Sequence, residues 1–350
     1  MSEALPRGSG RLAPGRPGSG RPISPVDPLL ALVDASLREQ LASETALVRA
    51  IGEHVFANPG KRLRPTLLML SAELCGYRGP RRVQLAAAHE MIHTATLLHD
   101  DVVDLSQLRR GQPAAHTVWG NRRAVLVGDF FYARASQMIV EDGELAIVGL
   151  FADMIRMMSE GELLQLERSF DPDASEAHYY AVIERKSAAL LSAVCEIGAI
   201  LGGVTPAERK RLADFGRELG LAFQMRDDAL DYAASADELG KPPLTDLREG
   251  KITMPLILAL KRASSAECEA TVAVLKNAAA RSAEGAGDTL EVTEIEGIRA
   301  LVARMRGVED TDRRALTHID KARTALAPFP PSDAKHALLA AADFSVSRRA

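Results

Sequence analysis

Apolar side chains recur at intervals of three and four residues along most of this chain. The first such series is Leu29, Leu30, Val33, Leu37 and Leu41. This spacing places apolar side chains on one face of an α-helix, whereas the alternating pattern of a half-buried strand is almost absent. Pairs such as Pro59-Gly60 and Thr205-Pro206 separate the periodic segments. The sequence therefore predicts an all-α fold with about ten or more helices.

The start of the chain differs from the rest in composition. Residues 1–25 are dominated by Gly, Pro, Arg and Ser, and such a segment lacks the apolar side chains that form a core. Residues 26–350 carry the helical periodicity, and the 350-residue chain is 47% hydrophobic, which is enough for a substantial core. We therefore expect a disordered tail followed by a single all-α domain.

Charge and cysteine content narrow the classes of function. The chain has 43 basic and 47 acidic residues, a net charge of −4, so no basic excess indicates nucleic-acid binding. Its three cysteines are too few for a disulfide framework, so a reducing cytoplasm is the simplest location. No run of about 18 apolar residues predicts a membrane span, although peripheral association with a membrane stays open.

Two acidic clusters share one pattern, Asp100-Asp101-x-x-Asp104 and Asp227-Asp228-x-x-Asp231. On a helix, the first and last carboxylates of each cluster face the same way. A single cluster of this kind is more often an exposed acidic face, but two clusters with apolar neighbours favour a binding site. Carboxylates without Cys or several His ligands suit Mg²⁺, which commonly joins them to substrate phosphates.

Basic residues accompany both acidic clusters along the chain. They are Lys61 and Arg64 before the first cluster, Arg109 and Arg110 after it, and Lys241 and Lys251 after the second. Taken singly, each is typically a solvated surface charge. Together they offer an anion forked contacts from arginine and mobile point charges from lysine. The combination indicates a substrate that carries a diphosphate or triphosphate.

With these motifs in this order, the sequence resembles the trans-polyprenyl diphosphate synthases, including the octaprenyl and other medium-to-long-chain enzymes. The residues that carry the resemblance are Gly60-Lys61-Arg62-Leu63-Arg64-Pro65, 93–104, Leu108-Arg109-Arg110-Gly111, Val127-Gly128-Asp129-Phe130, Glu160-Gly161-Glu162, Arg185-Lys186-Ser187-Ala188, 223–232, Gly240-Lys241 and 246–255. The resemblance implies an isoprenoid-synthase-type helical bundle around a central cavity and a homodimeric assembly.

The resemblance also implies roles for individual residues. Those that match positions holding isopentenyl diphosphate are Lys61, Arg64, His93 and Arg110. Those that match positions around the allylic diphosphate are Arg109, Lys186, Ser187, Gln224, Lys241 and Lys251. The six aspartates of the two clusters match Mg²⁺ ligands and, with Lys186, are the expected catalytic residues. Asp129 and Glu162 are interpreted as structural.

The sequence departs from the usual pattern of these enzymes in the loop before Asp246. Leu244 and Thr245 stand where relatives usually have Gly and Asp, and Ser187 stands where they usually have Thr. The serine keeps the hydroxyl, but the leucine replaces a residue of wide conformational freedom. Because this loop is altered, one alternative is that the chain is a partner subunit in a heteromeric synthase. Both complete Asp clusters argue against that alternative.

The reaction that the resemblance implies is head-to-tail condensation of isopentenyl diphosphate with an allylic diphosphate. In the family, bulky aromatic side chains just before the first cluster stop chain growth early, and here the small residues Ala95 and Thr96 occupy those positions. We therefore expect a medium-to-long-chain all-trans polyprenyl diphosphate, as used for quinone side chains. A shorter geranylgeranyl or farnesyl product is one alternative. A terpene cyclase or head-to-head synthase is another, but it would not require Lys61, Arg64 and His93.

Overall fold

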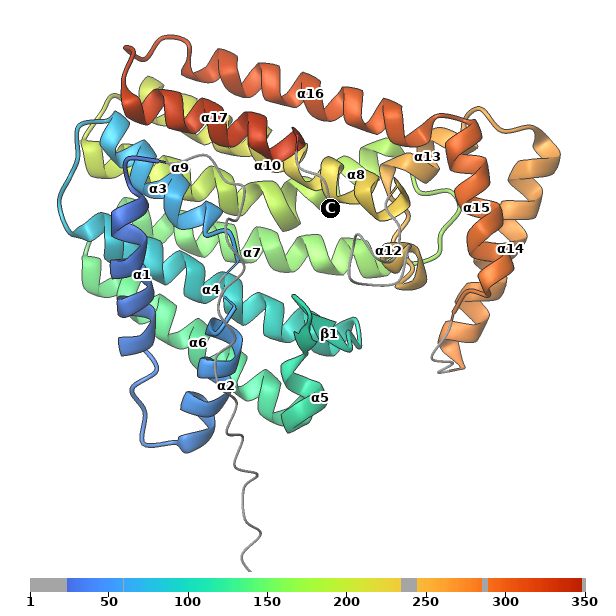
Figure 1. Ribbon diagram of the computed structural model, residues 1–350, viewed down its shortest axis with the longest axis horizontal. Helices are drawn as coiled ribbons and strands as arrows, with labels where there is room; N and C mark the ends of the chain where they lie inside the picture. The colour runs from blue at the N-terminus through green and yellow to red at the C-terminus, as the bar shows by residue number, and fades with distance from the viewer. Residues whose placement is uncertain (1–23, 59, 234–243, 285–288, 348–350) are drawn as a thin grey trace, which may run out of the picture.

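The computed structural model describes residues 24–58, 60–233, 244–284 and 289–347, and most of them are helical (Figure 1). The first half contains α1 (Asp27–Glu39), α2 (Ala46–Phe56), α3 (Leu63–Leu74), α4 (Arg81–Val103), α5 (Ala115–Trp119), α6 (Asn121–Asp142) and α7 (Leu145–Glu167). The second half contains α8 (Glu176–Ile183), η1 (Glu184–Ala188), α9 (Ala189–Gly202), α10 (Pro206–Ala233), α12 (Thr245–Arg248), α13 (Met254–Leu260), α14 (Ser265–Ala283), α15 (Val292–Arg304), α16 (Gly307–Leu326) and α17 (Asp333–Ser347). Two short antiparallel strands, β1 (Leu108–Arg109) and β2 (Gln112–Pro113), form a hairpin after α4. The all-α prediction is confirmed.

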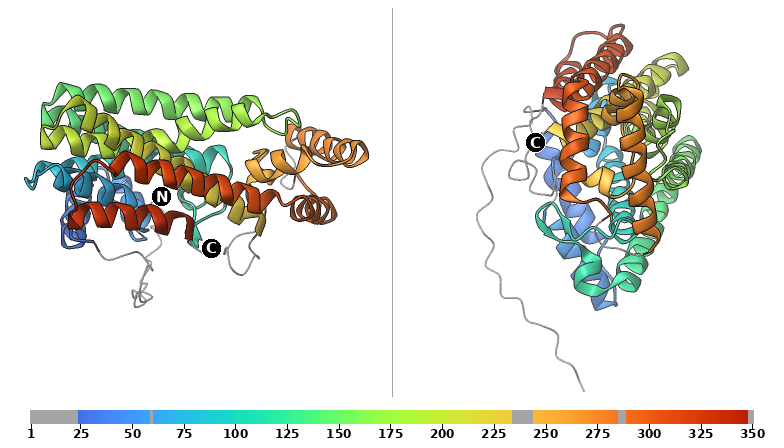
Figure 2. Two further views of the ribbon diagram at one scale, coloured as in Figure 1. Left: turned by 90° about the horizontal axis from the view of Figure 1, so that it is seen from above. Right: turned by 90° about the vertical axis from the view of Figure 1, so that its right-hand side faces the viewer.

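Long helices packed side by side form the body of the molecule. α10 packs against α9 and α16, α4 packs against α6, and α3 packs against α9. α16 and α17 run alongside each other over one face, as Figure 2 shows. α14 and α15 lie at the end of the molecule opposite α1 (Figure 1). A single apolar core extends from Val26 near the start of α1 to Ala342 in α17.

Two glycines on α10 let that helix approach its neighbours closely. A Cβ on Gly216 would lie 2.2 Å from the carbonyl oxygen of Leu191, and a Cβ on Gly220 would lie 2.5 Å from the Cα of Ala188. Both distances are far inside van der Waals contact, so only glycine fits. α10 therefore lies directly against η1 and α9, which brings the second acidic cluster close to η1.

A π-helical turn, η1, separates α8 from α9. Its first residue, Glu184, accepts a hydrogen bond from Nε of Arg217 on α10 at 2.7 Å. Such turns interrupt the regular α-helical ladder and are frequent at functional sites. This one carries Lys186 and Ser187, two of the residues expected around the allylic diphosphate.

The described part of the chain contains no helix with both the length and the apolarity to cross a membrane. Of the predicted tail, only residues 24 and 25 fall within the described ranges, and Ser24 is buried.

Candidate active site

A cavity of about 890 Å³ opens among α4, α6, α7, α8, η1, α10 and the segment 246–253. Apolar side chains such as Ile92, Met158 and Leu190 form part of its lining. Charged side chains from both acidic clusters form another part. The cavity therefore combines a surface for an apolar chain with groups that bind anions and cations.

The first acidic cluster lies on the last turns of α4, and its members divide into two roles. Asp100 and Asp104 line the cavity, as their spacing predicted. Asp101 is 4% exposed and accepts a hydrogen bond from Nε of Arg109 at 2.8 Å. Arg109 lines the cavity itself. Asp101 itself does not line the cavity, but it orients an arginine that does.

Of the predicted pair in the second cluster, on α10, only Asp227 lines the cavity. Its neighbour Asp228 also lines the cavity, but Asp231 does not. Asp231 is 1% exposed, and its Oδ2 accepts the backbone N–H of Asp246 at 3.1 Å. Residues 244–246 lie against the end of α10, where the backbone N–H of Leu244 also donates to the carbonyl oxygen of Asp231 at 3.3 Å. Asp246 from the same segment supplies a carboxylate to the cavity. Sequence spacing alone gave no signal for this exchange.

The cavity carboxylates raise one another's pKa. Burial, with Glu162 nearby, raises the pKa of Asp100 to about 7. Burial, with Asp246 nearby, raises the pKa of Asp228 to about 8. A divalent cation would relieve both the burial cost and the repulsion.

The donor set in the cavity consists of carboxylate oxygens, which suit a hard cation such as Mg²⁺ or Ca²⁺. No three Asp, Glu, His or Cys side chains among the described residues come together as a metal site on their own. These residues therefore fit a cation that is bound jointly with another ligand, such as a phosphate.

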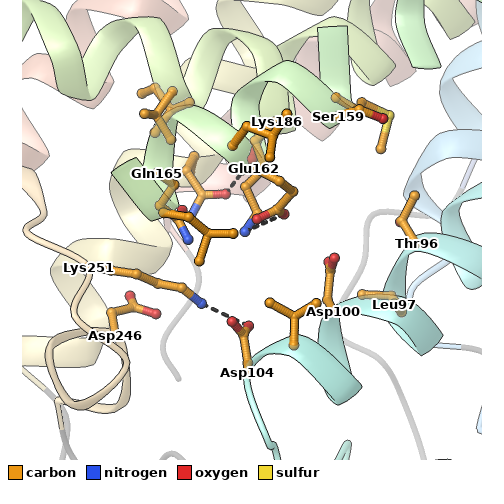
Figure 3. Close-up of a pocket in the computed structure, with 18 of the residues that line it drawn as sticks. Thr96, Leu97, Asp100, Asp104, Ser159, Glu162, Gln165, Lys186, Asp246 and Lys251 are labelled. Carbon is orange, nitrogen blue, oxygen red and sulfur yellow. Dashed lines mark hydrogen bonds and ion pairs between the residues drawn. The ribbon is translucent and has the colours of Figure 1, made fainter. Parts of the chain in front are cut away.

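Two lysines contact acidic side chains in the cavity (Figure 3). Nζ of Lys251 contacts Asp104 at 2.9 Å and Glu249 at 2.6 Å. Burial opposes the charge on Lys251, but these two carboxylates raise its pKa above the ordinary value. Nζ of Lys186 contacts Glu162 at 2.5 Å. Lys241, the third expected lysine, lies outside the described residues.

Glu162 is a cavity residue that sequence reasoning placed among the structural ones. It lines the cavity, contacts Lys186 and faces Asp100, whose pKa it raises. The motif Glu160-Gly161-Glu162 was the only signal that could have found it. Gly161 lies in close contact with the backbone of Lys186, so α7 brings Glu162 against η1.

Ser187 and Gln224, both expected around the allylic diphosphate, are hydrogen-bonded to each other. Oγ of Ser187 donates to Oε1 of Gln224 at 2.6 Å, and Nε2 of Gln224 donates to Oδ1 of Asp228 at 2.8 Å. Both side chains line the cavity. The hydroxyl that serine shares with threonine is therefore engaged in this arrangement.

A second group of basic side chains gathers around His93. Burial and the nearby Arg64 and Arg110 hold the pKa of His93 well below its ordinary value, so the ring is neutral at pH 7. Nε of Arg64 is buried and has no hydrogen-bond partner among the described residues. Nη1 of Arg110 donates to the backbone oxygen of Asn58 at 2.7 Å. This basic environment suits a second anion.

Lys61 and Arg110 do not line the cavity that Arg64 and His93 line. Lys61 is exposed, with Nζ 5.1 Å from the centre of the Phe344 ring. Arg110 lines a small adjoining pocket together with Arg109 and Arg62. Arg62, which sequence reasoning missed, is buried and paired with Asp34 and Glu90 at 2.7 Å each. It anchors the start of α3, and therefore Arg64, to α1 and α4.

Only one of the two expected chain-length residues faces the cavity. Thr96 lines it, together with Ile92 one turn earlier. Ala95 is 1% exposed and is not part of the lining. Neighbouring residues on a helix point about 100° apart, so the two positions cannot share one cavity equally.

A helical bundle with an apolar cavity, opposed carboxylates and two groups of basic side chains defines an enzyme class that handles phosphate-bearing apolar substrates. Comparisons with known proteins agree. Residues 45–290 match the family model described as polyprenyl synthetase. The octaprenyl diphosphate synthase of Escherichia coli K12 is 40% identical over 319 residues, which are 91% of this chain and 95% of that protein.

Two solved structures resemble the whole bundle. A polyprenyl synthase from Caulobacter crescentus CB15, complexed with calcium and isoprenyl diphosphate, aligns with a TM-score of 0.85 at 42% identity, over 93% of this chain and 96% of that one. A decaprenyl diphosphate synthase from Rhodobacter capsulatus aligns with a TM-score of 0.83 at 40% identity, over 92% and 96%. The chain belongs to the polyprenyl synthetase family.

Proposed function

We propose that this protein condenses isopentenyl diphosphate head-to-tail with an allylic diphosphate in a Mg²⁺-dependent reaction. The observation that carries the proposal is the division of the basic side chains into two groups beside one cavity. Lys186, Lys251 and Arg109 lie with the cavity carboxylates, whereas Arg64 lies beside His93. A condensation of two diphosphates needs two such places, whereas a cyclase needs one.

We propose that the allylic diphosphate binds against the cavity aspartates Asp100, Asp104, Asp227 and Asp228. Mg²⁺ bound there would neutralise diphosphate oxygens and act as a Lewis acid on the leaving group. Lys186, Lys251 and Arg109 line the same cavity and would stabilise the negative charge that grows on the departing diphosphate. The apolar lining would exclude water from the allylic cation, which isopentenyl diphosphate attacks through its double bond. The departing diphosphate can accept the proton that is then lost.

The second substrate is assigned to the group around Arg64. Its guanidinium presents a forked set of donors, and the Nε described above lacks a partner within the described chain. The neutral His93 ring can donate a hydrogen bond without adding a charge. Arg110 adds to the basic environment of His93. We propose that these residues, with the exposed Lys61 three positions before Arg64, hold isopentenyl diphosphate.

We propose a medium-to-long-chain product, destined for a quinone side chain. The octaprenyl and decaprenyl diphosphate synthase relatives support this length. The small Thr96 in the cavity lining supports it as well, because it leaves room beside the first cluster. The three cysteines are free, which fits the proposed cytoplasmic location.

We also propose a homodimer. Large apolar side chains on α6 and at the start of α7 are more than half exposed: Leu126, Val140 and Leu145. Leu126 and Val140 are about four helical turns apart and lie on the same side of α6. A second copy would remove this apolar surface from water, and light scattering after gel filtration measures the mass directly.

The deciding experiment incubates the purified chain with Mg²⁺, isopentenyl diphosphate and farnesyl diphosphate, and sizes the products by mass spectrometry. We expect products longer than geranylgeranyl diphosphate, and none when Mg²⁺ is chelated or when Asp100→Asn replaces the wild type. Elongation by the single chain would also exclude an obligatory partner subunit. Failure to elongate any allylic primer would overturn the proposal.

A further inference from the structure

Tyr179 on α8 makes a buried hydrogen bond to the second acidic cluster. Its hydroxyl donates to Oδ2 of Asp228 at 2.5 Å, and the two side chains are 4% and 2% exposed. Tyr179 also lines the cavity. No step of the proposed reaction uses this hydroxyl, and nothing in the sequence singled it out.

The bond belongs to a chain of four side chains from three elements. Tyr179 holds one oxygen of Asp228, and Gln224 holds the other at 2.8 Å. Gln224 in turn accepts the hydroxyl of Ser187 at 2.6 Å. Because both carboxylate oxygens have a donor, the plane of the Asp228 carboxylate is set from α8 on one side and from α10 on the other.

We propose that Tyr179 is a positioning residue that orients Asp228 for the joint binding of Mg²⁺ and the allylic diphosphate. This inference rests on the proposed function and deepens it. A buried carboxylate without hydrogen-bond donors is costly. The tyrosine hydroxyl supplies a donor, restricts rotation of the Asp228 carboxylate and leaves its remaining lone pairs directed by the protein.

The same bonds also reach η1. Ser187 lies on η1 next to Lys186, which contacts Glu162 on the neighbouring α7. Loss of the Tyr179 hydroxyl frees one oxygen of Asp228 and weakens the constraint on Gln224 and Ser187. Among the described residues no hydrogen bond or ion pair joins Tyr179 to Arg64 or His93, so we expect Tyr179 to act on the allylic side of the cavity.

The neighbouring Tyr180 provides a matched control. It is a tyrosine on the same helix, packed edge-on against Tyr179 with ring centres 6.0 Å apart. Its hydroxyl faces Nε2 of His318 at 3.3 Å, and it is not among the residues that line the cavity. Removal of either hydroxyl leaves the aromatic ring in place, so a packing role alone would give the two variants similar behaviour.

The test compares Tyr179→Phe with Tyr180→Phe and with the wild type. Calorimetric titration of inorganic diphosphate in the presence of Mg²⁺ measures joint binding without turnover. We expect Tyr179→Phe to weaken it about tenfold, or about 1.4 kcal/mol, and Tyr180→Phe to leave it unchanged. In the condensation assay, Tyr179→Phe should raise the Mg²⁺ requirement and the KM for the allylic diphosphate, with the KM for isopentenyl diphosphate unchanged.

The outcomes separate this inference from the proposed function. Wild-type protein that binds Mg²⁺ and diphosphate but elongates nothing would contradict the proposed function alone. Wild-type elongation with equal diphosphate binding by Tyr179→Phe and wild type would overturn the positioning role. Equal weakening by both tyrosine variants would also overturn it. If Tyr179→Phe does not fold, Tyr179→Leu, which also lacks the hydroxyl and keeps an apolar side chain, must give the same selective loss.

Discussion

Nζ of Lys251 lies 2.9 Å from Oδ2 of Asp104 and joins two segments that are 147 residues apart in the chain. The same nitrogen contacts Glu249 at 2.6 Å. The ammonium group of Lys251 therefore holds two partly buried carboxylates together at the cavity, one of which belongs to the first acidic cluster.

Replacement of Lys251 by Met should lower both activity and stability. Asp104 and Glu249 would then face each other without a cation, and the departing diphosphate would lose a positive partner. We expect kcat to fall by about 100-fold or more. The melting temperature without Mg²⁺ should fall as well, and Mg²⁺ with inorganic diphosphate should restore part of it. Lys261→Met, which removes an exposed pair with Glu176, is the control. A variant with wild-type kcat would contradict this prediction.

Replacement of Arg64 by Lys should weaken one substrate selectively. Lysine keeps the positive charge but loses the forked donors and the buried Nε. We expect the KM for isopentenyl diphosphate to rise about tenfold, with little change in the KM for the allylic substrate. Initial-rate kinetics with each substrate varied in turn measures both. Arg211→Lys, on the exposed surface of α10, should behave as the wild type. Equal rises in both constants would argue against separate sites.

Replacement of Thr96 by Phe should shorten the product. Thr96 lines the cavity beside the first cluster, so a phenyl ring there would occupy space that a growing chain needs. Product sizing by mass spectrometry should show a shift towards fewer isoprene units. Thr96→Val, which keeps the volume of the side chain, should leave the distribution unchanged. An unaltered distribution in the Phe variant would mean that the chain grows elsewhere.

Replacement of Leu244 by glycine should cost less stability than its replacement by alanine. Its φ of 54° lies in the left-handed region, which costs a non-glycine residue about 1–2 kcal/mol, yet its side chain is fully buried. Both Leu244→Ala and Leu244→Gly lose the buried side chain, at about 2–5 kcal/mol. Only glycine also relieves the backbone strain, so Leu244→Gly should be more stable than Leu244→Ala by about 1 kcal/mol. Urea unfolding measures both, and the reverse order would show that no strain is present.

His89 should make the fold sensitive to acid. It is fully buried on α4, its Nδ1–H donates to the backbone oxygen of Leu85 at 2.8 Å, and Nε2 has no partner among the described residues. Burial lowers the pKa of His89 to about 4. The unfolded chain, with a histidine pKa of about 6.5, therefore binds more protons between pH 6.5 and 4.

The free energy of unfolding should fall through this window, by about 3 kcal/mol at pH 4 from His89 alone. It should be fully restored above about pH 6.5. His89→Leu should shift the midpoint of acid unfolding to lower pH, as followed by circular dichroism. His336→Leu, on the exposed side of α17, should not. An unchanged midpoint in His89→Leu would assign the acid sensitivity to other groups.

The sequence by itself determined the helical class and supplied candidate residues for the chemistry. Apolar spacing of three and four is a local property, so it survives in any packing of the helices. The pair Asp100 and Asp104 could be predicted on the same ground, because α4 continues to Val103 and Asp104 is its C-cap residue. Arg64, Lys186 and Gln224 could be selected only through motif resemblance, since each taken singly is an ordinary polar residue.

The tertiary structure decided which of those side chains enter the cavity. Asp231 accepts a hydrogen bond from the backbone of Asp246, and the Asp246 carboxylate lines the cavity where Asp231 was expected. The two residues belong to different segments of the chain. Glu162 reaches Lys186 because α7 packs against the π-helical turn, and Ala95 is excluded because α4 presents Thr96 instead. Helical spacing states which residues share a face, but only the neighbouring elements decide where that face points. The contact between Lys251 and Asp104 is therefore a property of the folded chain alone.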